Sequence, residues 1–139
     1  MRVAAALLLL AAGCREPAAD PARFYPPRDR AQAALETALT GWQQGAVAGT
    51  VPGTTDPVVQ FVDSHHPSGQ RLRGYTILGL APGDGPRVFT VRLTVDGSSE
   101  GVRARYVVFG VDPVWVFRHE DYEMMSHWDH PMTKDGSGR

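Results

Sequence analysis

From Phe89 onward the segment Arg87–Val95, RVFTVRLTV, alternates between apolar and polar side chains. In an extended chain, four of its apolar residues would lie on one face: Phe89, Val91, Leu93 and Val95. The intervening polar residues would then lie on the opposite face. A two-residue period is incompatible with an amphipathic helix, so the segment predicts a strand of a sheet with one buried face.

Shorter apolar segments on both sides of this strand extend the predicted sheet. Gly- and Asp-rich turns at 81–86 and 96–101 separate it from its neighbours in the chain. Pro113 cannot donate a ladder hydrogen bond, so it marks a turn or bulge between two strands. We therefore expect an antiparallel sheet of about four to five strands. Besides Arg87–Val95, its strands are predicted at Val58–Val62, Arg71–Leu80, Val102–Val111 and Val114–Arg118.

The segment Asp29–Gln44 follows the helical period instead. Asp29 is expected to cap its start, Gln32 completes a capping-box pattern, and Gly45 suits a left-handed stop. Because its apolar stripe is narrow and rich in alanine, this helix should pack closely against a sheet. The stripe consists of Ala31, Ala34, Leu35, Ala38, Leu39 and Trp42.

One N-terminal helix packed on a curved antiparallel sheet defines an α+β domain, with a possible short C-terminal helix over Glu120–Trp128. The end of the first helix reads LTGWQQG, Leu39–Gly45, and long strands follow it. This layout is similar to the NTF2-like and cystatin-like folds. The resemblance implies the fold alone, because NTF2-like domains include isomerases, cyclases, ligand carriers and association modules.

The first thirteen residues, MRVAAALLLLAAG, have the layout of a secretory signal peptide. Their apolar run, Val3–Ala12, is shorter than the roughly 20 residues that span a bilayer. The adjoining segment Leu10–Cys14, LAAGC, resembles the lipobox of bacterial lipoproteins. The resemblance implies cleavage before Cys14, a diacylglycerol on its sulfur, and a further fatty acid such as palmitate on the new amino group.

Cys14 is the only cysteine, so no disulfide can form within the chain. Two or three acyl chains would give lasting attachment, since each buried methylene contributes about 0.8 kcal/mol. The alternative is an ordinary secretory signal with Cys14 near the cleavage point by chance. We expect a lipid-anchored protein of the cell envelope, facing the extracytoplasmic side.

Behind the signal peptide, residues 14–27 are predicted to form a proline-rich tether. Residues 28–132 are predicted to form a single α+β domain, and residues 133–139 a disordered tail. The formal net charge of −1 is too close to zero to indicate nucleic acid as a partner.

The segment Arg118–His130, RHEDYEMMSHWDH, contains three of the five histidines. In a helix, Glu123 and His127 would lie one turn apart and His119 a turn earlier, so these residues and His130 could bind zinc. Against a metal site, the segment lacks an HExxH motif, and ligands from one short segment would have little outer support. An acid–base role for this segment is a further alternative.

A structural interpretation of the same segment rests on its apolar residues. Met124, Met125 and Trp128 would share one side of the helix. We expect this side to close the core as a lid, with Trp128 against Trp115 and Phe117, while the charged side stays in water.

A second polar cluster lies in VDSHHPSG, residues 62–69, which is expected to form an exposed turn. Alternatively, Asp63 ends a strand and faces a cavity beside His65, where it could act as a general base. A hydrolase triad of Asp63, Ser64 and His65 is rejected, because adjacent residues do not converge on one point and no Gly-x-Ser-x-Gly elbow exists.

Four arginines occupy alternating positions in two predicted strands: Arg71, Arg73, Arg103 and Arg105. They could line one face of the sheet and bind an anionic lipid headgroup or cell-wall polymer there, or pair with acidic residues across strands. We expect a non-catalytic module without a cofactor that associates with an envelope protein, a polymer or a small ligand. An NTF2-like enzyme or ligand binder and a zinc module are the alternatives. A closed pocket with a buried carboxylate would favour an enzyme, and a filled sheet face would favour association.

Overall fold

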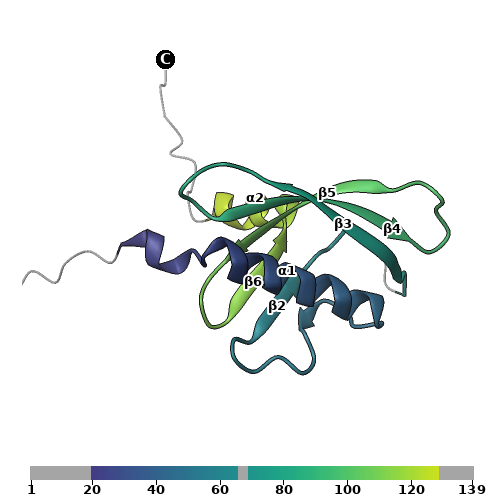
Figure 1. Ribbon diagram of the computed structural model, residues 1–139, viewed down its shortest axis with the longest axis horizontal. Helices are drawn as coiled ribbons and strands as arrows, with labels where there is room; N and C mark the ends of the chain where they lie inside the picture. Colours follow the sequence, from purple (N-terminus) through teal and green to yellow (C-terminus); the bar gives the residue numbers. More distant parts are fainter. Residues whose placement is uncertain (1–19, 66–68, 129–139) are drawn as a thin grey trace, which may run out of the picture.

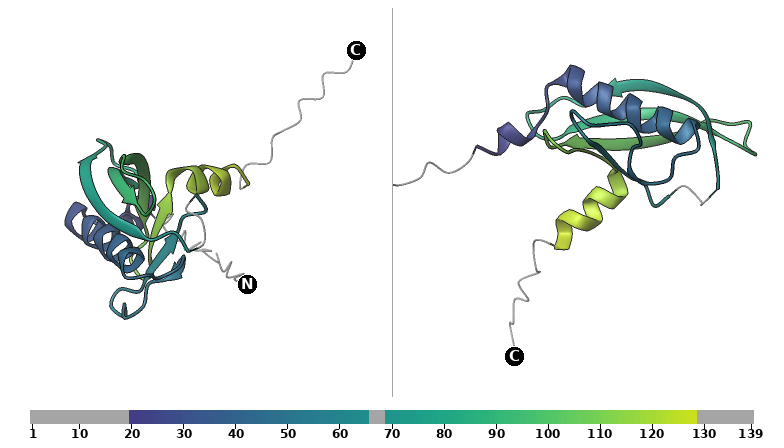
Figure 2. Two further views of the ribbon diagram at one scale, coloured as in Figure 1. Left: turned by 90° about the vertical axis from the view of Figure 1, so that its right-hand side faces the viewer. Right: turned by 90° about the horizontal axis from the view of Figure 1, so that it is seen from below.

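The computed structural model describes residues 20–65 and 69–128 and confirms the α+β prediction. Helix α1, Arg28–Gln43, packs on the inner face of a six-stranded sheet, and helix α2, His119–Trp128, projects from the opposite side (Figures 1 and 2). A short 3-10 helix, η1, spans Pro21–Phe24. The strands are β1 (Gly49–Thr50), β2 (Val59–Val62), β3 (Leu72–Leu80), β4 (Arg87–Val95), β5 (Val102–Phe109) and β6 (Val114–Arg118).

The sheet has the strand order β1-β2-β6-β5-β4-β3. Strands β3 to β6 form the predicted antiparallel meander, and β4 and β6 have the predicted bounds. The prediction was wrong for β2, which pairs in parallel with β6, for example Phe61 beside Val116. Between β2 and β3 the chain therefore crosses from the second strand at one side of the sheet to the opposite edge. The additional strand β1 arises in the predicted loop, where Gly49 pairs with Phe61.

Helix α1 begins one residue earlier than predicted, at Arg28. Pro27 occupies the N-cap position, and no side chain makes a cap hydrogen bond, so the predicted capping role of Asp29 is wrong. Asp29 instead lies in the first turn, where a negative charge interacts favourably with the helix dipole. Gly45 has φ +93°, which confirms the predicted left-handed stop.

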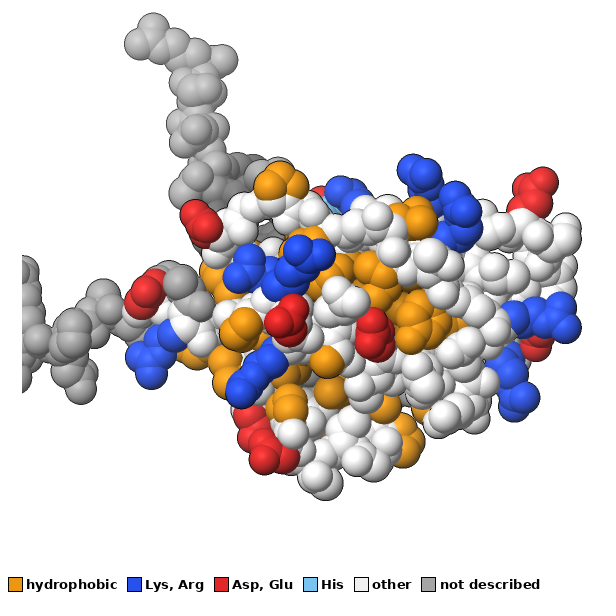
Figure 3. Space-filling model, viewed as in Figure 1, with side chains coloured by type: hydrophobic (Ala, Val, Ile, Leu, Met, Phe, Trp, Pro, Cys, Tyr) orange, Lys and Arg blue, Asp and Glu red, His pale blue; other side chains and the backbone are white. Residues whose placement is uncertain are grey.

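The core lies between α1 and the inner face of the sheet. All six predicted stripe residues of α1 are buried, and Leu35 and Leu39 are 0% exposed. They belong to one apolar cluster with inner-face side chains of the sheet that include Phe61, Phe89, Val91, Tyr106 and Val116. Figure 3 shows the α1 side of the molecule from outside, with hydrophobic and charged side chains interspersed. The inner face is thus filled by side chains.

The outer face carries a separate aromatic cluster. Phe109, Trp115 and Phe117 stack along β5 and β6, with ring centroids 5.4–5.5 Å apart, and Tyr122 of α2 contacts Phe109 edge-on at 5.6 Å. Tyr122 therefore takes the place that was predicted for Trp128. Beyond Tyr122, α2 leaves the sheet (Figure 2).

The lid prediction for α2 is consequently wrong. Met124, Met125 and Trp128 are 59%, 42% and 83% exposed, and none of the residues of α2 is buried. The physical reason is that the contacts of Tyr122 and the hydrogen bonds to Asp121, all near the start of the helix, fix its direction away from the core.

The chain before α1 contacts the domain from residue 24 onward. The backbone N–H of Gly110 donates to the carbonyl oxygen of Phe24 at 2.6 Å, and Pro26 is fully buried. Residues 24–27, predicted as part of the tether, thus lie against the end of β5. Within the described ranges, no helix is long and apolar enough to cross a membrane.

Candidate functional site

Asp63 directly follows β2, as predicted for a strand-end carboxylate, but it does not lie in an exposed turn. Alternate residues of β2 face the core, so Val59 and Phe61 place Asp63 on the inner face as well. Asp63 is 3% exposed and is the one buried charged residue in the described part of the chain. A carboxylate in such a position requires partners, because unpaired burial is costly.

Three groups satisfy the Asp63 carboxylate. The Tyr106 hydroxyl donates a hydrogen bond to Oδ2 at 2.7 Å, and the backbone N–H of His65 donates to Oδ1 at 2.9 Å. Nη1 of Arg118 lies 3.6 Å from Oδ2. Tyr106 and Arg118 come from β5 and β6, so the carboxylate links the end of β2 to the adjacent strand β6 and to β5 beyond it.

The pKa values around this carboxylate reflect the pairing. Burial, and then the negative charge of Asp63, raise the pKa of Tyr106 far above its ordinary value of 10.0. Burial opposes the charge of Arg118, but Asp63, Tyr106 and Glu120 outweigh this effect and raise the Arg118 pKa above its ordinary value. Partial burial likewise opposes the charge of Glu120, yet its own backbone hydrogen bond and Arg118 lower the Glu120 pKa. At neutral pH, Tyr106 therefore keeps its proton and Arg118 its charge.

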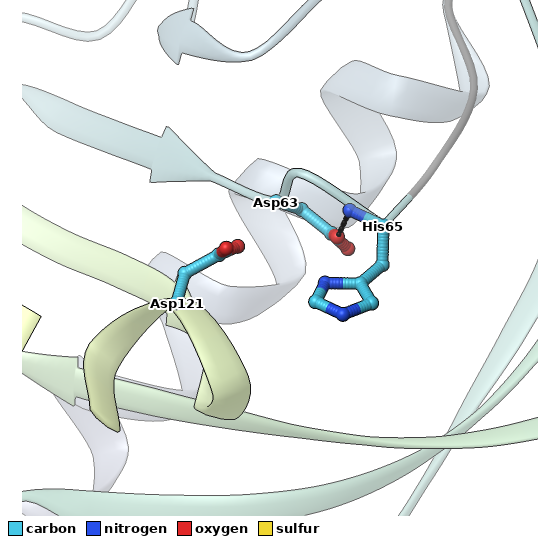
Figure 4. A group of neighbouring side chains, drawn as sticks. All are labelled: Asp63, His65 and Asp121. Atoms are coloured by element: carbon cyan, nitrogen blue, oxygen red, sulfur yellow. Dashed lines mark hydrogen bonds between the residues drawn. The ribbon is translucent and has the colours of Figure 1, made fainter. Parts of the chain in front are cut away.

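Asp121 of α2 completes the rim of this site, and Figure 4 shows it facing Asp63 and His65. The Ser64 backbone N–H donates to Asp121 Oδ2 at 2.9 Å, and the Ser64 hydroxyl donates to Asp121 Oδ1. His65 Nδ1 lies 3.5 Å from the Ser64 Oγ. The loop after β2 is thereby joined to the first turn of α2.

Asp63, His65 and Asp121 form the one metal-ligand group of three found within residues 20–65 and 69–128, with candidate atoms within 4.8 Å of one another. A nitrogen and two carboxylates are suitable ligand types for zinc. However, Arg118 already places a positive charge against Asp63, and both carboxylates already accept hydrogen bonds. A second cation would be repelled by the first, so this group fits a hydrogen-bonded joint better than a metal site.

The zinc ligands predicted on α2 are only partly brought together. His119 Nδ1 lies 3.5 Å from Glu123 Oε1, as the one-turn spacing indicated, and 3.3 Å from Nη2 of Arg105. His127 is exposed and joins no group of three metal-ligand side chains in the described chain. His130 lies outside the described residues, as do Cys14 and residues 133–139.

A groove of about 420 Å³ runs past Asp63, lined by Trp42, Ala46, Gln70 and Arg71 among others. The Asp63 side chain is 0% exposed, so its carboxylate is covered from this groove. A general base must come within about 3 Å of the proton that it removes. The His65 ring does not connect Asp63 to a substrate either. Asp63 accepts a hydrogen bond from the backbone N–H of His65 and not from its ring.

The four predicted arginines do not share one face. Arg71 lines the groove beside Trp42 at the end of α1, whereas Arg105 contacts His119 at the start of α2. Arg73 pairs with Asp96 at 3.0 Å, an exposed ion pair of the kind expected across strands. The exposed Arg103 lies opposite Arg92 in the sheet register.

Sequence reasoning identified Asp63 and His65 but missed Tyr106, Arg118 and Asp121. The strand alternation contained a signal for two of them. Tyr106 lies in step with the inner-face residues Ala104 and Val108, and Arg118 in step with Val114 and Val116. A polar or charged group at an inward position needs a buried partner.

No family model, curated protein or solved structure matches the chain. The resemblances to the lipobox and to NTF2-like and cystatin-like folds stay predictions.

Proposed function

We propose that this protein is a lipid-anchored protein of the cell envelope whose domain acts by association and not by catalysis. The sequence LAAGC, with the only cysteine directly after a short apolar run, supports the lipid anchor. The partner classes consistent with the anchor are another envelope protein, an envelope polymer or a small ligand.

One observation carries the non-catalytic assignment: α1 fills the inner face of the sheet. An enzyme or ligand carrier of this layout would use that face as a largely pre-formed pocket. Here Leu35, Leu39 and Tyr106 occupy it and are 0% exposed. The carboxylate best placed for acid–base chemistry, Asp63, has both oxygens bonded within the protein. The enzyme alternative is therefore not favoured.

The zinc alternative is also less well supported than association. Its predicted ligands on α2 do not converge, and the group that does converge contains a carboxylate paired with Arg118. A metal would have to displace that ion pair, which costs more than binding at an unpaired site.

The lipid anchor can be tested by expressing the full chain in bacteria supplied with an alkyne-bearing fatty acid. We expect the wild type to carry the label, to fractionate with membranes and to have a mass that corresponds to cleavage before Cys14. Cys14→Ser should lose the label and the cleavage, because no other thiol is present. Arg15→Lys, a change at the adjacent position, serves as the control and should behave as wild type. Labelling and cleavage retained in Cys14→Ser would contradict the proposal.

A further inference from the structure

Helix α1 begins and helix α2 projects at the same end of the molecule (Figures 1 and 2). Large apolar side chains of the segments at this end are exposed. We call this surface the apolar end. The members on α2 are the most exposed on average, with Trp128 at 83%, and such large exposed aromatic groups mark interaction surfaces. The apolar end consists of Phe24, Val111, Met124, Met125 and Trp128.

Contacts join the three segments that supply these side chains. Phe24 of η1 accepts the backbone hydrogen bond of Gly110, which directly precedes Val111. Phe109, at the end of the same strand, contacts Tyr122 of α2.

The short segment before η1 limits the distance between Cys14 and this end of the domain. Only six residue steps separate Cys14 from Asp20, the first described residue. A fully extended chain spans at most about 3.6 Å per residue, so this segment reaches no further than about 22 Å. An acylated Cys14 in a bilayer would therefore hold the η1 end of the domain close to the membrane surface.

The side chains of α2 suit such a surface. By helical spacing, Met124 and Trp128 lie one turn apart with Met125 beside them, whereas Glu123 and His127 lie one turn apart on the adjacent face. Helices with this division lie in the membrane interface with their apolar side inserted, and tryptophan is enriched there. Because the polar side of α2 is acidic, insertion would not depend on anionic headgroups.

We propose that the apolar end rests on the bilayer that holds the anchor, with Trp128 inserted at the boundary between headgroups and acyl chains. This proposal rests on the proposed lipid anchor at Cys14. In this proposal the apolar side of α2 contacts the membrane, and the edges of the sheet stay available to other partners.

The test uses the mature acylated protein reconstituted in phosphatidylcholine vesicles, with or without bromine on the upper acyl chain. Bromine quenches tryptophan fluorescence on contact, so it reports insertion. Trp42 is buried in the core and Trp115 is half-buried in the outer aromatic cluster. We expect brominated lipid to lower the wild-type emission, and most of this loss to disappear in Trp128→Phe.

Two further variants identify the source of the signal. Trp115→Phe should retain the quenching, because that side chain is not part of the apolar end. Met124→Asp with Met125→Asp should abolish quenching of Trp128 while the protein stays on the vesicles through its acyl chains. Circular dichroism confirms that each variant remains folded.

Each remaining outcome would overturn the proposal in a distinguishable way. If the protein is acylated but Trp128 is not quenched, the apolar end binds a protein partner or a second copy and not the membrane. The proposed lipid anchor would be unaffected by that result. A purified protein without acyl chains on Cys14 would overturn the anchor and this proposal together.

Discussion

Removal of the Asp63 carboxylate would leave the buried hydroxyl of Tyr106 without its acceptor, and Arg118 would keep Glu120 as its only ion-pair partner among the described residues. We expect Asp63→Ala to lower the free energy of unfolding by about 1–3 kcal/mol, because a buried donor is left unsatisfied. Urea unfolding at pH 7 measures this. Asp84→Ala, in an exposed turn, should stay within about 0.5 kcal/mol of wild type. Equal stability of Asp63→Ala and wild type would show that the carboxylate is not a structural group.

Tyr106 predicts an alkaline limit to stability. In the unfolded chain tyrosine loses its proton near pH 10.0, whereas in the folded protein the raised pKa keeps Tyr106 protonated. Above pH 10 the folded state therefore binds more protons than the unfolded state, and stability falls by up to about 1.4 kcal/mol per pH unit for this group.

Urea unfolding between pH 9 and pH 11.5 tests this dependence. Tyr106→Phe should show a shallower loss than wild type, and not a flat profile, because burial also raises the Tyr122 pKa. The same slope in both proteins would contradict the assigned role of Tyr106.

Among the elements, α1 contributes most directly to the core. Leu35 is 0% exposed and belongs to the cluster that fills the inner face. We expect Leu35→Ala to cost about 2–5 kcal/mol, the range for leucine truncation in a packed core. The neighbouring exposed Glu36 provides the control, since Glu36→Ala should have little effect. If thermal melting shows similar losses for both variants, the inner face is less tightly filled than we infer.

The same elements explain what the sequence could predict. The α1 stripe and the β4 alternation were predicted correctly because local periodicity reports which face of an element is buried. The parallel pairing of β2 with β6 was not, since register between segments that are distant in the chain has no local signal. The site follows the same division. Asp63 was identified as the residue that ends a strand. Its partner Tyr106 lies 43 positions away in the chain, and Asp121 lies 57 positions from its partner Ser64, so no local pattern could predict these contacts.

At the scale of the whole molecule, the prediction that α2 closes the core was wrong. Amphipathic spacing shows which side of a helix is apolar but not which surface that side faces. The helix is attached at its first turns alone, by Tyr122 on the outer aromatic cluster and by the Asp121 hydrogen bonds to Ser64. The core lies on the other side of the sheet. This arrangement predicts that α2 can detach without unfolding the domain, because few buried contacts hold it.

Tyr122→Ala tests whether α2 is such a separate unit, with hydrogen–deuterium exchange as the measurement. We expect faster exchange of the α2 amides and unchanged exchange in α1, β4 and β5. Met125→Ala, which removes a partly exposed side chain from the same helix, should leave all of these rates near wild type. Faster exchange in the sheet as well would mean that α2 and the core unfold together. Local acceleration alone would show that the domain keeps its fold when α2 is released from the sheet.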